Sequence, residues 1–339
     1  MKINKRIDVL DYLRGFALLG IILVNVEGIR SLHISPPEST VDAIYVSFLS
    51  LFIEGKFFAI FSTLFGIGFY IFMDRAKQKS QNEYALFGRR LLILLIFGIL
   101  HSLLQPGEAL KIYAITGISL FVFYHFKKRL NLVIGVLLLL ITLVLDAKAL
   151  TVLPYFILGL SIGQYGWIYK MSIKSKGWYI AWTISLITVI LSFIVLTVYY
   201  AQPNYIWAEK SGIDVETYAQ NKTLFNHIVL LTSPFISSFY VLSLILIVQT
   251  QFGQRLLLPL KYYGRMALTN YIGQTLLMFA YSSYVIRTEI SWTHSLLMCL
   301  VIYVLQIIFS VYWLKYFTNG PLEYVWRIGT YLKVLKLKR

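Results

Sequence analysis

The chain has 339 residues, of which 58% are hydrophobic and only 14% are charged, and its mean hydropathy is +0.71. This composition excludes an ordinary soluble domain, in which about half of the residues are apolar and about a quarter are charged. The 31 lysines and arginines against 15 acidic residues give a formal net charge of +16. In a membrane protein this excess indicates loops at an anionic cytoplasmic surface, so we expect no nucleic-acid partner. The single cysteine, Cys299, excludes an internal disulfide and a cysteine-rich metal site, and we expect no metal.

Ten apolar segments follow one another along the chain, each comparable to the about 20 residues that cross a bilayer core. They run over residues 12–26, 56–73, 91–105, 109–126, 130–147, 151–169, 178–200, 225–250, 266–286 and 294–316. A further apolar stretch at 43–53 is too short to cross alone, so we interpret it as an interfacial or re-entrant piece. The pattern predicts an all-α, polytopic integral membrane protein with about ten transmembrane helices, in a single membrane domain over residues 1–339.

The distribution of lysine and arginine predicts the orientation in the membrane. With the N-terminus inside, 24 of the 31 cations fall on cytoplasmic segments, and the external side keeps seven: Arg30, Lys56, Lys111, Lys148, Lys210, Lys222 and Arg287. Because cytoplasmic loops of membrane proteins are enriched in these residues, we predict that both termini are cytoplasmic. The basic tail, with Lys333, Lys336 and Lys338, is expected to lie on anionic lipid at the cytoplasmic face of the bilayer.

The first predicted span carries polar residues along one face. Asp11 and Arg14 are three residues apart and can form an ion pair, and Asn25 returns to within about 20° of Arg14 around the helix. An ionisable residue inside a span is a functional candidate, because its burial in hydrocarbon is costly. A structural interpretation stays open beside this one. In it the Asp–Arg pair fixes the helix and Asn25 caps it. On either interpretation Gly15 and Gly20 allow another helix to approach closely.

A second polar group collects at the external ends of the early spans. His101 and Glu108 are its most informative members, because the short turn between two spans makes them antiparallel neighbours and brings this pair close. A histidine beside a carboxylate is a candidate general base or nucleophile, and His33, in a loop, is a candidate for the same role. Histidines also serve as plain hydrogen-bonding residues between helices, so both interpretations stay open. The full group is Asn25, Glu27, Arg30, His33, Glu54, Lys56, His101, Glu108 and Lys111.

Amides form a third polar group near the cytoplasmic end of the span 266–286. Asn270 and Gln274 are four residues apart and share a helix face, close to Arg265. In hydrocarbon such amides must find partners. They therefore either bond neighbouring helices, which contributes roughly 1 kcal/mol each, or form the polar wall of a cavity.

Five ordered motifs resemble those of the YeiB-like bacterial membrane proteins, which carry domain of unknown function 418. The resemblance covers nearly the whole chain, with a C-terminal family part over about residues 178–332. It implies a multi-pass protein of the bacterial cell membrane and no established activity. One departure is Glu108, where the family usually has aspartate. The motifs are Asp11-Tyr-Leu-Arg14-Gly15 continuing to Asn25, Lys56-Phe-Phe-Ala-Ile-Phe-Ser-Thr-Leu-Phe-Gly66, His101-Ser-Leu-Leu with Glu108-Ala-Leu-Lys-Ile-Tyr113, Gly264-Arg-Met-Ala-Leu-Thr-Asn-Tyr-Ile-Gly-Gln274, and Gly320-Pro-Leu-Glu-Tyr-Val-Trp-Arg327.

The N-terminal part, about residues 1–126, also resembles the transmembrane acyltransferases of the heparan-glucosaminide acetyltransferase type. In those proteins a similar Asp-x-x-Arg-Gly helix ends in an asparagine, and a histidine soon after it takes part in acyl transfer. Asn25 followed by His33 stands in the corresponding place. This resemblance implies that a cytoplasmic acyl-CoA donates an acyl group to a small-molecule or lipid-linked acceptor of the cell envelope.

On this hypothesis the polar residues receive definite roles. Guanidinium groups match phosphate oxygens, so arginines at cytoplasmic helix ends are candidates for the CoA phosphates, and the two amides are candidates for the pantetheine arm. A histidine removes the acceptor proton or carries the acyl group, Glu108 or Glu27 orients it, and Asn25 donates to the thioester oxyanion. The candidate catalytic residues are His33, His101, Asn25 and Glu108. The candidate donor-binding residues are Asp11, Arg14, Arg89, Arg90, Arg265, Asn270 and Gln274.

Two other function classes stay open. In a transporter of small solutes the intramembrane polar residues line a path, and Gly66, Gly68, Gly159 and Gly163 are then candidate helix breaks. In a non-catalytic membrane scaffold or sensor the same polar residues only hold helices together. The sequence names neither the acyl group nor the acceptor, and it leaves a homo-oligomer open.

Overall fold

The structure, a computed structural model, describes residues 7–285 and 289–338, and its regular elements within these ranges are helices. Two isolated β-bridges, Ile34 with Ile290 and Phe317 with Lys338, join loop segments. The predicted all-α class is therefore confirmed for the part of the chain that the structure describes. Arg287 and the last residue of the predicted span 266–286 lie outside the described residues.

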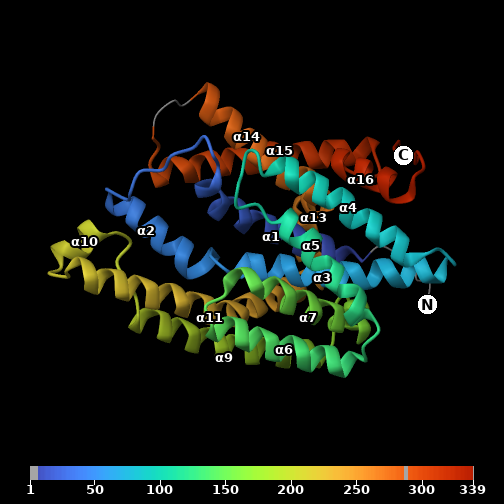
Figure 1. Cartoon of the computed structure of the whole chain (residues 1–339), viewed down its shortest axis with the longest axis horizontal. Coiled ribbons are helices and arrows are strands. Elements are labelled where there is room, and N and C mark those ends of the chain that lie inside the picture. Colours follow the sequence, from blue (N-terminus) through green and yellow to red (C-terminus); the bar gives the residue numbers. More distant parts are fainter. Residues whose placement is uncertain (1–6, 286–288, 339) are drawn as a thin grey trace.

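Most of the helices pack side by side along the long axis of the molecule (Figure 1). In chain order the elements are α1 (Asp8–Asn25), η1 (Val26–Gly28), α2 (Thr40–Phe48), η2 (Leu49–Ile53), α3 (Lys56–Gln78), α4 (Glu83–His101), α5 (Leu110–Tyr124), α6 (Lys128–Val144), η3 (Lys148–Thr151), α7 (Val152–Gln164), α8 (Trp167–Lys170), α9 (Lys176–Val198), α10 (Tyr205–Lys210), α11 (Val215–Val248), α12 (Gln251–Leu256), α13 (Leu258–Arg265), α14 (Ala267–Tyr284), α15 (Trp292–Tyr316) and α16 (Pro321–Tyr331).

Six helical segments among the described residues are long and apolar enough to cross a membrane: Asp8–Gly28, Thr40–Gln78, Glu83–His101, Lys176–Val198, Val215–Val248 and Trp292–Tyr316. The chain is therefore a multi-pass membrane protein. The other four predicted spans coincide with α5, α6, α7 and α14, which are helices of 13 to 18 residues. A total of ten spans stays a prediction.

The short apolar stretch 43–53 is also helical. It belongs to α2 and to the π-helical turn η2 that directly follows α2. Gly55, with a φ of +77°, then turns the chain into α3. Glycine suits this position, because residues with a Cβ rarely adopt a positive φ.

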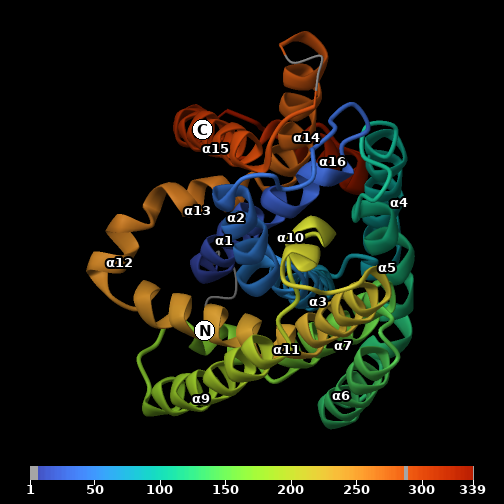
Figure 2. The ribbon, with the colours of Figure 1, turned by 90° about the vertical axis from the view of Figure 1, so that its left-hand side faces the viewer.

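α1 lies at the centre of the helix bundle. Figure 2 looks along the bundle and shows α1 and α3 with the other helices around them. Of the most apolar stretch of α1, 72% is buried inside the protein, whereas only 22% of the corresponding stretch of α9 is buried. α9 therefore exposes large apolar side chains, such as Ile184 and Ile187, and a helix face of this kind is suited to contact with the lipid bilayer.

Two glycines bring α1 and α13 into direct backbone contact. A Cβ on Gly264 would lie 1.9 Å from the carbonyl oxygen of Asp11, and one on Gly15 would lie 2.2 Å from the carbonyl oxygen of Leu260. Small residues at such crossings let two helices approach closely. The expectation that Gly15 is a point of close approach is confirmed.

Glycines also join α3 to α7, and this contact corrects one expectation. A Cβ on Gly66 would lie 2.1 Å from the carbonyl oxygen of Phe156, and one on Gly159 would lie 2.1 Å from that of Thr63. Both helices run through these positions without interruption. The prediction of helix breaks at Gly66, Gly68, Gly159 and Gly163 is therefore wrong, because both helices are continuous there. Gly66, Gly159 and Gly163 serve helix packing, and Gly68 lies beside Arg14.

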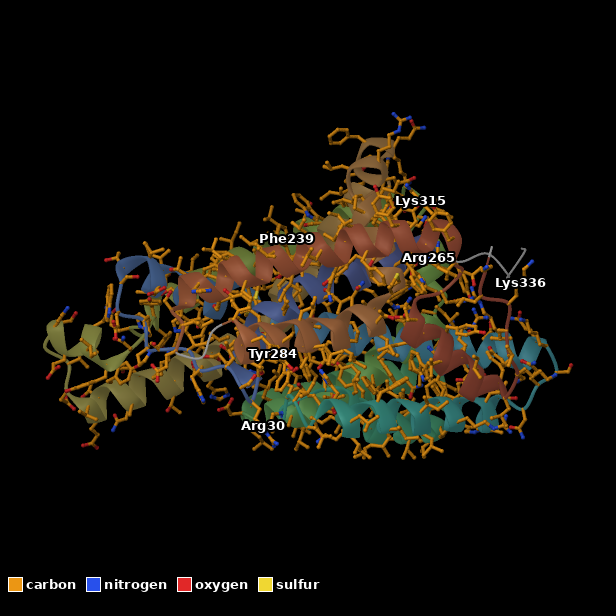
Figure 3. All side chains as sticks on the ribbon, turned by 90° about the horizontal axis from the view of Figure 1, so that it is seen from above. Arg30, Phe239, Arg265, Tyr284, Lys315 and Lys336 are labelled. Carbon is orange, nitrogen blue, oxygen red and sulfur yellow. The ribbon has the colours of Figure 1, made fainter. Side chains whose placement is uncertain are left out.

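One end of the bundle, here called the α16 end, gathers many of the helix ends that were predicted to be cytoplasmic. α1 begins at this end and α16 lies at it (Figure 1). Figure 3 shows Arg265 and Lys336 toward this end, whereas Arg30 lies away from it. The grouping agrees with the predicted sidedness of these residues. That the α16 end faces the cytoplasm stays a prediction.

Candidate functional site

A cavity of about 550 Å³ lies between α1, α3, α4, α5, α14 and α16. Its lining reaches the exposed residues Lys79 and Gln81 after the end of α3, so the cavity opens at the α16 end. Fixed cations beside low-dielectric walls attract anions, and basic side chains outnumber carboxylates in this lining. Among the described residues the charged members of the lining are the cations Arg14, Arg75, Lys79, Arg90, Arg265 and Arg327 and the carboxylates Asp11 and Glu323.

The charge of the cavity is confined to one part of its length. Along α3 the lining extends from Phe61 to Lys79, a distance of about 27 Å at the rise of an α-helix. The cations of α3, Arg75 and Lys79, lie near the opening. The opposite part, here called the inner end, is formed by uncharged residues: Phe61, Phe65, Leu94, Leu110, Tyr113 and Tyr271. The cavity therefore has a cationic mouth and an uncharged inner end.

Asp11 and Arg14 pair in the cavity wall, as their spacing on α1 predicts. The Arg14 Nη1 atom lies 3.2 Å from Asp11 Oδ1, and Asp11 is only 1% exposed. Arg14 itself keeps 31% of its side chain accessible. The pair therefore holds one guanidinium group in place beside the cavity while leaving part of that group accessible to an anion.

Contacts with α16 and the loop before it hold three further guanidinium groups. Arg90 of α4 lies over the ring of Trp326, 3.7 Å from its centroid, and Trp326 Nε1 donates a hydrogen bond of 2.8 Å to the Arg90 carbonyl oxygen. Arg327 donates to Asn319 Oδ1 at 2.8 Å, and Arg265 donates to the carbonyl oxygen of Thr318 at 3.2 Å. Stacked and hydrogen-bonded guanidinium groups of this kind are pre-organised to bind phosphate oxygens.

Glu323 of α16 fastens this helix to the start of α14. Its carboxylate accepts hydrogen bonds from the backbone nitrogens of Leu268 and Thr269, at 2.7 and 3.1 Å, and from Thr269 Oγ1 at 2.6 Å. Burial raises the pKa of Glu323 above its ordinary value, although the hydrogen bonds from Thr269 and Leu268 oppose this rise. A side chain of α16 thus satisfies backbone donors at the N-terminus of α14.

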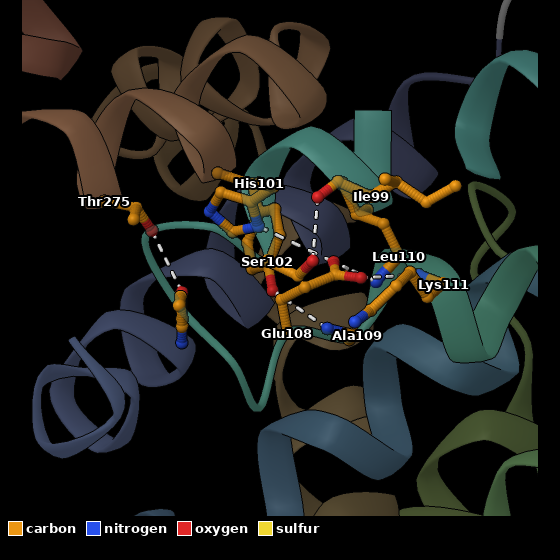
Figure 4. A network of polar contacts seen from close by, with 10 residues as sticks. Ile99, His101, Ser102, Glu108, Ala109, Leu110, Lys111 and Thr275 are labelled. Carbon is orange, nitrogen blue, oxygen red and sulfur yellow. Dashed lines mark hydrogen bonds and ion pairs between the residues drawn. The ribbon is translucent and has the colours of Figure 1, made fainter. Parts of the chain in front are cut away.

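His101 and Glu108 meet at the turn between α4 and α5 (Figure 4). His101 Nδ1 lies 3.5 Å from Glu108 Oε2, and both side chains are at most 1% exposed. Glu108 also accepts hydrogen bonds from the backbone nitrogens of Leu110 and Lys111, at 2.6 and 2.7 Å, which fixes its carboxylate at the start of α5. Neither ring nitrogen of His101 has a hydrogen-bond partner among the described residues, so Nδ1 and Glu108 are within ion-pair distance only. A buried polar atom without a partner is rare and requires an explanation.

Tyr271 of α14 connects His101 with the cavity. Its ring lies edge-on to the ring of His101, with a centroid distance of 5.1 Å. Its hydroxyl group accepts a hydrogen bond of 3.3 Å from the Ala109 backbone nitrogen and lies beside the side chain of Asn25. Tyr271 also lines the inner end of the cavity. The uncharged inner end therefore adjoins three of the four candidate catalytic residues: Asn25, His101 and Glu108.

Four sequence-predicted site residues lie outside this arrangement. His33 is exposed in the loop after η1, and Arg89 is exposed on α4 beside the lining residue Arg90. The amide of Asn270 donates to the Tyr263 carbonyl oxygen and to Ser310 Oγ, at 2.9 and 3.0 Å. That of Gln274 donates to Tyr263 Oη at 2.6 Å. Both amides are 1% exposed and absent from the lining, so they join helices and do not form the cavity wall.

Sequence reasoning missed several cavity residues. Arg75, Lys79, Arg327 and Tyr271 line the cavity but are not among the candidate site residues predicted from the sequence. The positions of Arg75 and Lys79, near the cytoplasmic end of a predicted span, are the same signal that drew attention to Arg90. Tyr271 stands between the two predicted amides, and only the packing of α14 against α4 and α5 reveals its importance.

Comparisons with known proteins find relatives in bacteria. A family model described as protein of unknown function, DUF418, matches residues 162–333. The chain is 44% identical to an uncharacterized 39.9 kDa protein in the amylase 3′ region of Bacillus acidopullulyticus, over 97% of this chain and 95% of the relative. It is 27% identical to the uncharacterized protein YeiB of Escherichia coli (strain K12), over 94% of both chains. No solved structure matches the chain significantly. The resemblance to YeiB-like proteins is confirmed, and the resemblance to acyltransferases stays a prediction.

Proposed function

We propose a function from the geometry of the cavity, on the premise that the chain belongs to the DUF418 family of proteins of unknown function. The protein is an integral-membrane acyltransferase of the bacterial cell membrane. It crosses the membrane ten times, with both termini and the mouth of the cavity on the cytoplasmic side. It takes an acyl group from acyl-CoA and transfers it to a small-molecule or lipid-linked acceptor.

The observation that carries this proposal is the polarity of the cavity. Its lining holds six basic side chains against two carboxylates, from Lys79 at the mouth to Arg14 beside Gly68, and its inner end is uncharged and adjoins His101. An acyl-CoA is built in the same way, with phosphates at one end and an uncharged arm that carries the thioester at the other. The volume of about 550 Å³ is within the usual range of small-molecule sites. We propose that Arg14, Arg75 and Arg90 bind the phosphates, because guanidinium groups pair with phosphate oxygens.

The residues beside the inner end supply the chemistry of transfer. His101 removes a proton from the acceptor hydroxyl or amine, and Glu108 orients the imidazole and stabilises its charged form. The acceptor oxygen or nitrogen then attacks the thioester carbonyl, the carbon–sulfur bond breaks, and the leaving thiolate takes the proton from His101. The products are the acylated acceptor and CoA with a free thiol. Asn25 donates a hydrogen bond to the oxyanion that forms during the attack.

Purified protein in lipid nanodiscs tests this proposal. We expect CoA to bind, and acetyl-CoA to be hydrolysed slowly with release of free thiol when water is the acceptor. His101→Ala should abolish thiol release and leave CoA binding intact, whereas Arg75→Leu should weaken CoA binding. His33→Ala is the control and should change neither readout, because His33 is exposed and outside the cavity lining. The proposal fails if CoA does not bind, or if His101→Ala hydrolyses acetyl-CoA as the unaltered protein does.

One observation favours a second function, transport of an organic phosphate. The cavity opens at the α16 end and stops at Tyr113 and Tyr271 within the bundle, as in a carrier that is open to one side of the membrane. The continuous helices α3 and α7 count against broken-helix carriers. Sealed vesicles distinguish the two functions, because a transporter accumulates labelled CoA or phosphate without releasing thiol from the thioester.

A further inference from the structure

Tyr271 belongs to both parts of the candidate site. Its side chain lines the inner end of the cavity. His101 is absent from that lining and is 3% exposed, yet its ring lies 5.1 Å from the ring of Tyr271, at an interplanar angle of 61°. The Tyr271 ring therefore stands between the cavity and the imidazole of His101.

Two neighbouring elements hold this ring in position. The backbone nitrogen of Ala109, just before α5, donates to the Tyr271 hydroxyl at 3.3 Å, and the side chain of Asn25, at the end of α1, lies beside the same hydroxyl. His101 contacts the ring from α4. Tyr271 itself is on α14, so its side chain contacts groups from three other segments of the chain. Displacement of the ring moves the hydroxyl oxygen and therefore requires the hydrogen bond from Ala109 to break.

We infer that Tyr271 is a positioning residue whose ring forms the barrier between the cavity and His101. Its hydroxyl fixes the barrier through the hydrogen bond from Ala109. A ligand in the cavity reaches His101 when its uncharged end displaces this ring. The identity of that ligand as acyl-CoA rests on the proposed function, but the barrier itself does not depend on it.

Chemical modification of His101 tests the barrier directly. Diethyl pyrocarbonate is a small uncharged reagent that carbethoxylates accessible imidazoles, and mass spectrometry reports each histidine separately. In the unaltered protein the exposed His33 serves as the internal reference, and we expect His101 to react at least about 100-fold more slowly, because a buried group reacts only during local opening. Tyr271→Ala should bring the rate of His101 to within about ten-fold of that of His33.

Two further variants separate the ring from its hydroxyl and from general loosening of the cavity. Tyr271→Phe keeps the ring and loses the hydrogen bond from Ala109, so the rate of His101 should rise by only about five-fold. Tyr113→Ala is the matched control. Tyr113 also lines the inner end, but its hydroxyl is hydrogen-bonded to Ser62 and its ring packs on Phe65 and Phe156, so His101 should stay protected.

The inference and the proposed function fail in different measurements. If CoA does not bind and no thiol is released, the proposed function fails, while carbethoxylation still reports on the barrier. The barrier is refuted if His101 of the unaltered protein reacts as fast as His33, if Tyr271→Ala leaves it protected, or if Tyr113→Ala exposes it equally. Monodisperse elution and a sharp thermal transition verify folding, and Tyr271→Leu replaces Tyr271→Ala if the alanine variant does not fold.

Discussion

A methyl group added at Gly264 tests whether direct backbone contact between α1 and α13 sets the spacing of the cavity wall. In Gly264→Ala the new Cβ would lie 1.9 Å from the carbonyl oxygen of Asp11 and 2.4 Å from the backbone nitrogen of Gly15. Ordinary contacts begin near 3.4 Å, so the closer pair must separate by about 1.5 Å. Both neighbouring atoms belong to the backbone, and no side-chain rotation relieves the clash. Overpacking of this kind typically costs about 1–3 kcal/mol of folding free energy.

The matched control for this substitution is Gly88→Ala in α4. A Cβ on Gly88 meets nothing within 4 Å, so this change should be neutral or should stabilise the helix by up to about 1 kcal/mol. Thermal unfolding of both variants in the same detergent measures the difference. Gly264→Ala should also weaken CoA binding, because separation of α1 from α13 moves Arg14 away from Arg265. Equal melting temperatures for Gly264→Ala and Gly88→Ala would refute the reasoning.

Three further substitutions address the cavity wall, the attachment of α16 and an exposed ion pair. Arg90→Leu removes a guanidinium group of the cavity wall and should weaken CoA binding by about ten-fold, whereas Arg89→Leu, one residue away and outside the lining, should leave the dissociation constant unchanged in the same calorimetric titration. Burial raises the pKa of Glu323 above its ordinary value of 4.5. The protonated side chain therefore stabilises the fold fully below pH 4.5, and this stabilisation is lost as the pH rises through the raised pKa. The melting temperature of the unaltered protein should fall over that pH range, and that of Glu323→Gln should not. The ion pair of Glu54 with Lys148 spans 2.9 Å, but the two side chains are 41% and 55% exposed, so Glu54→Gln should change the unfolding free energy by less than about 1 kcal/mol, and a larger loss in a denaturant titration would contradict this.

Local sequence patterns were sufficient for much of the fold and for two close contacts of the site. Each of the ten predicted spans coincides with a helix, because long apolar runs are strong signals. The pair Asp11 and Arg14 follows from a spacing of three residues on one helix. The approach of His101 to Glu108 follows from the short turn that joins two antiparallel helices.

Contacts between distant segments could not be predicted in the same way. Arg90 is held by Trp326, which lies 236 residues further along the chain, and no local pattern indicates this pairing. The amides of Asn270 and Gln274 are a case in which the local pattern was sufficient for the helix face but not for the partners. Their spacing of four residues predicts the shared helix face. That the two amides donate hydrogen bonds to other helices depends on the positions of Tyr263 and Ser310. Arg90 lines the cavity and Arg89 does not, and this difference depends on which face α4 turns toward the cavity.

The cavity wall is formed by residues from both α1 and α16, and this has a consequence for biosynthesis. Asp11 and Arg14 leave the ribosome early, whereas Glu323 and Arg327 are made near the end of translation. The complete cavity wall therefore cannot exist on a nascent chain, and it forms only after α16 has been synthesised. A product truncated before Pro321 would retain the early basic residues beside an incomplete wall, without the carboxylate that caps the start of α14.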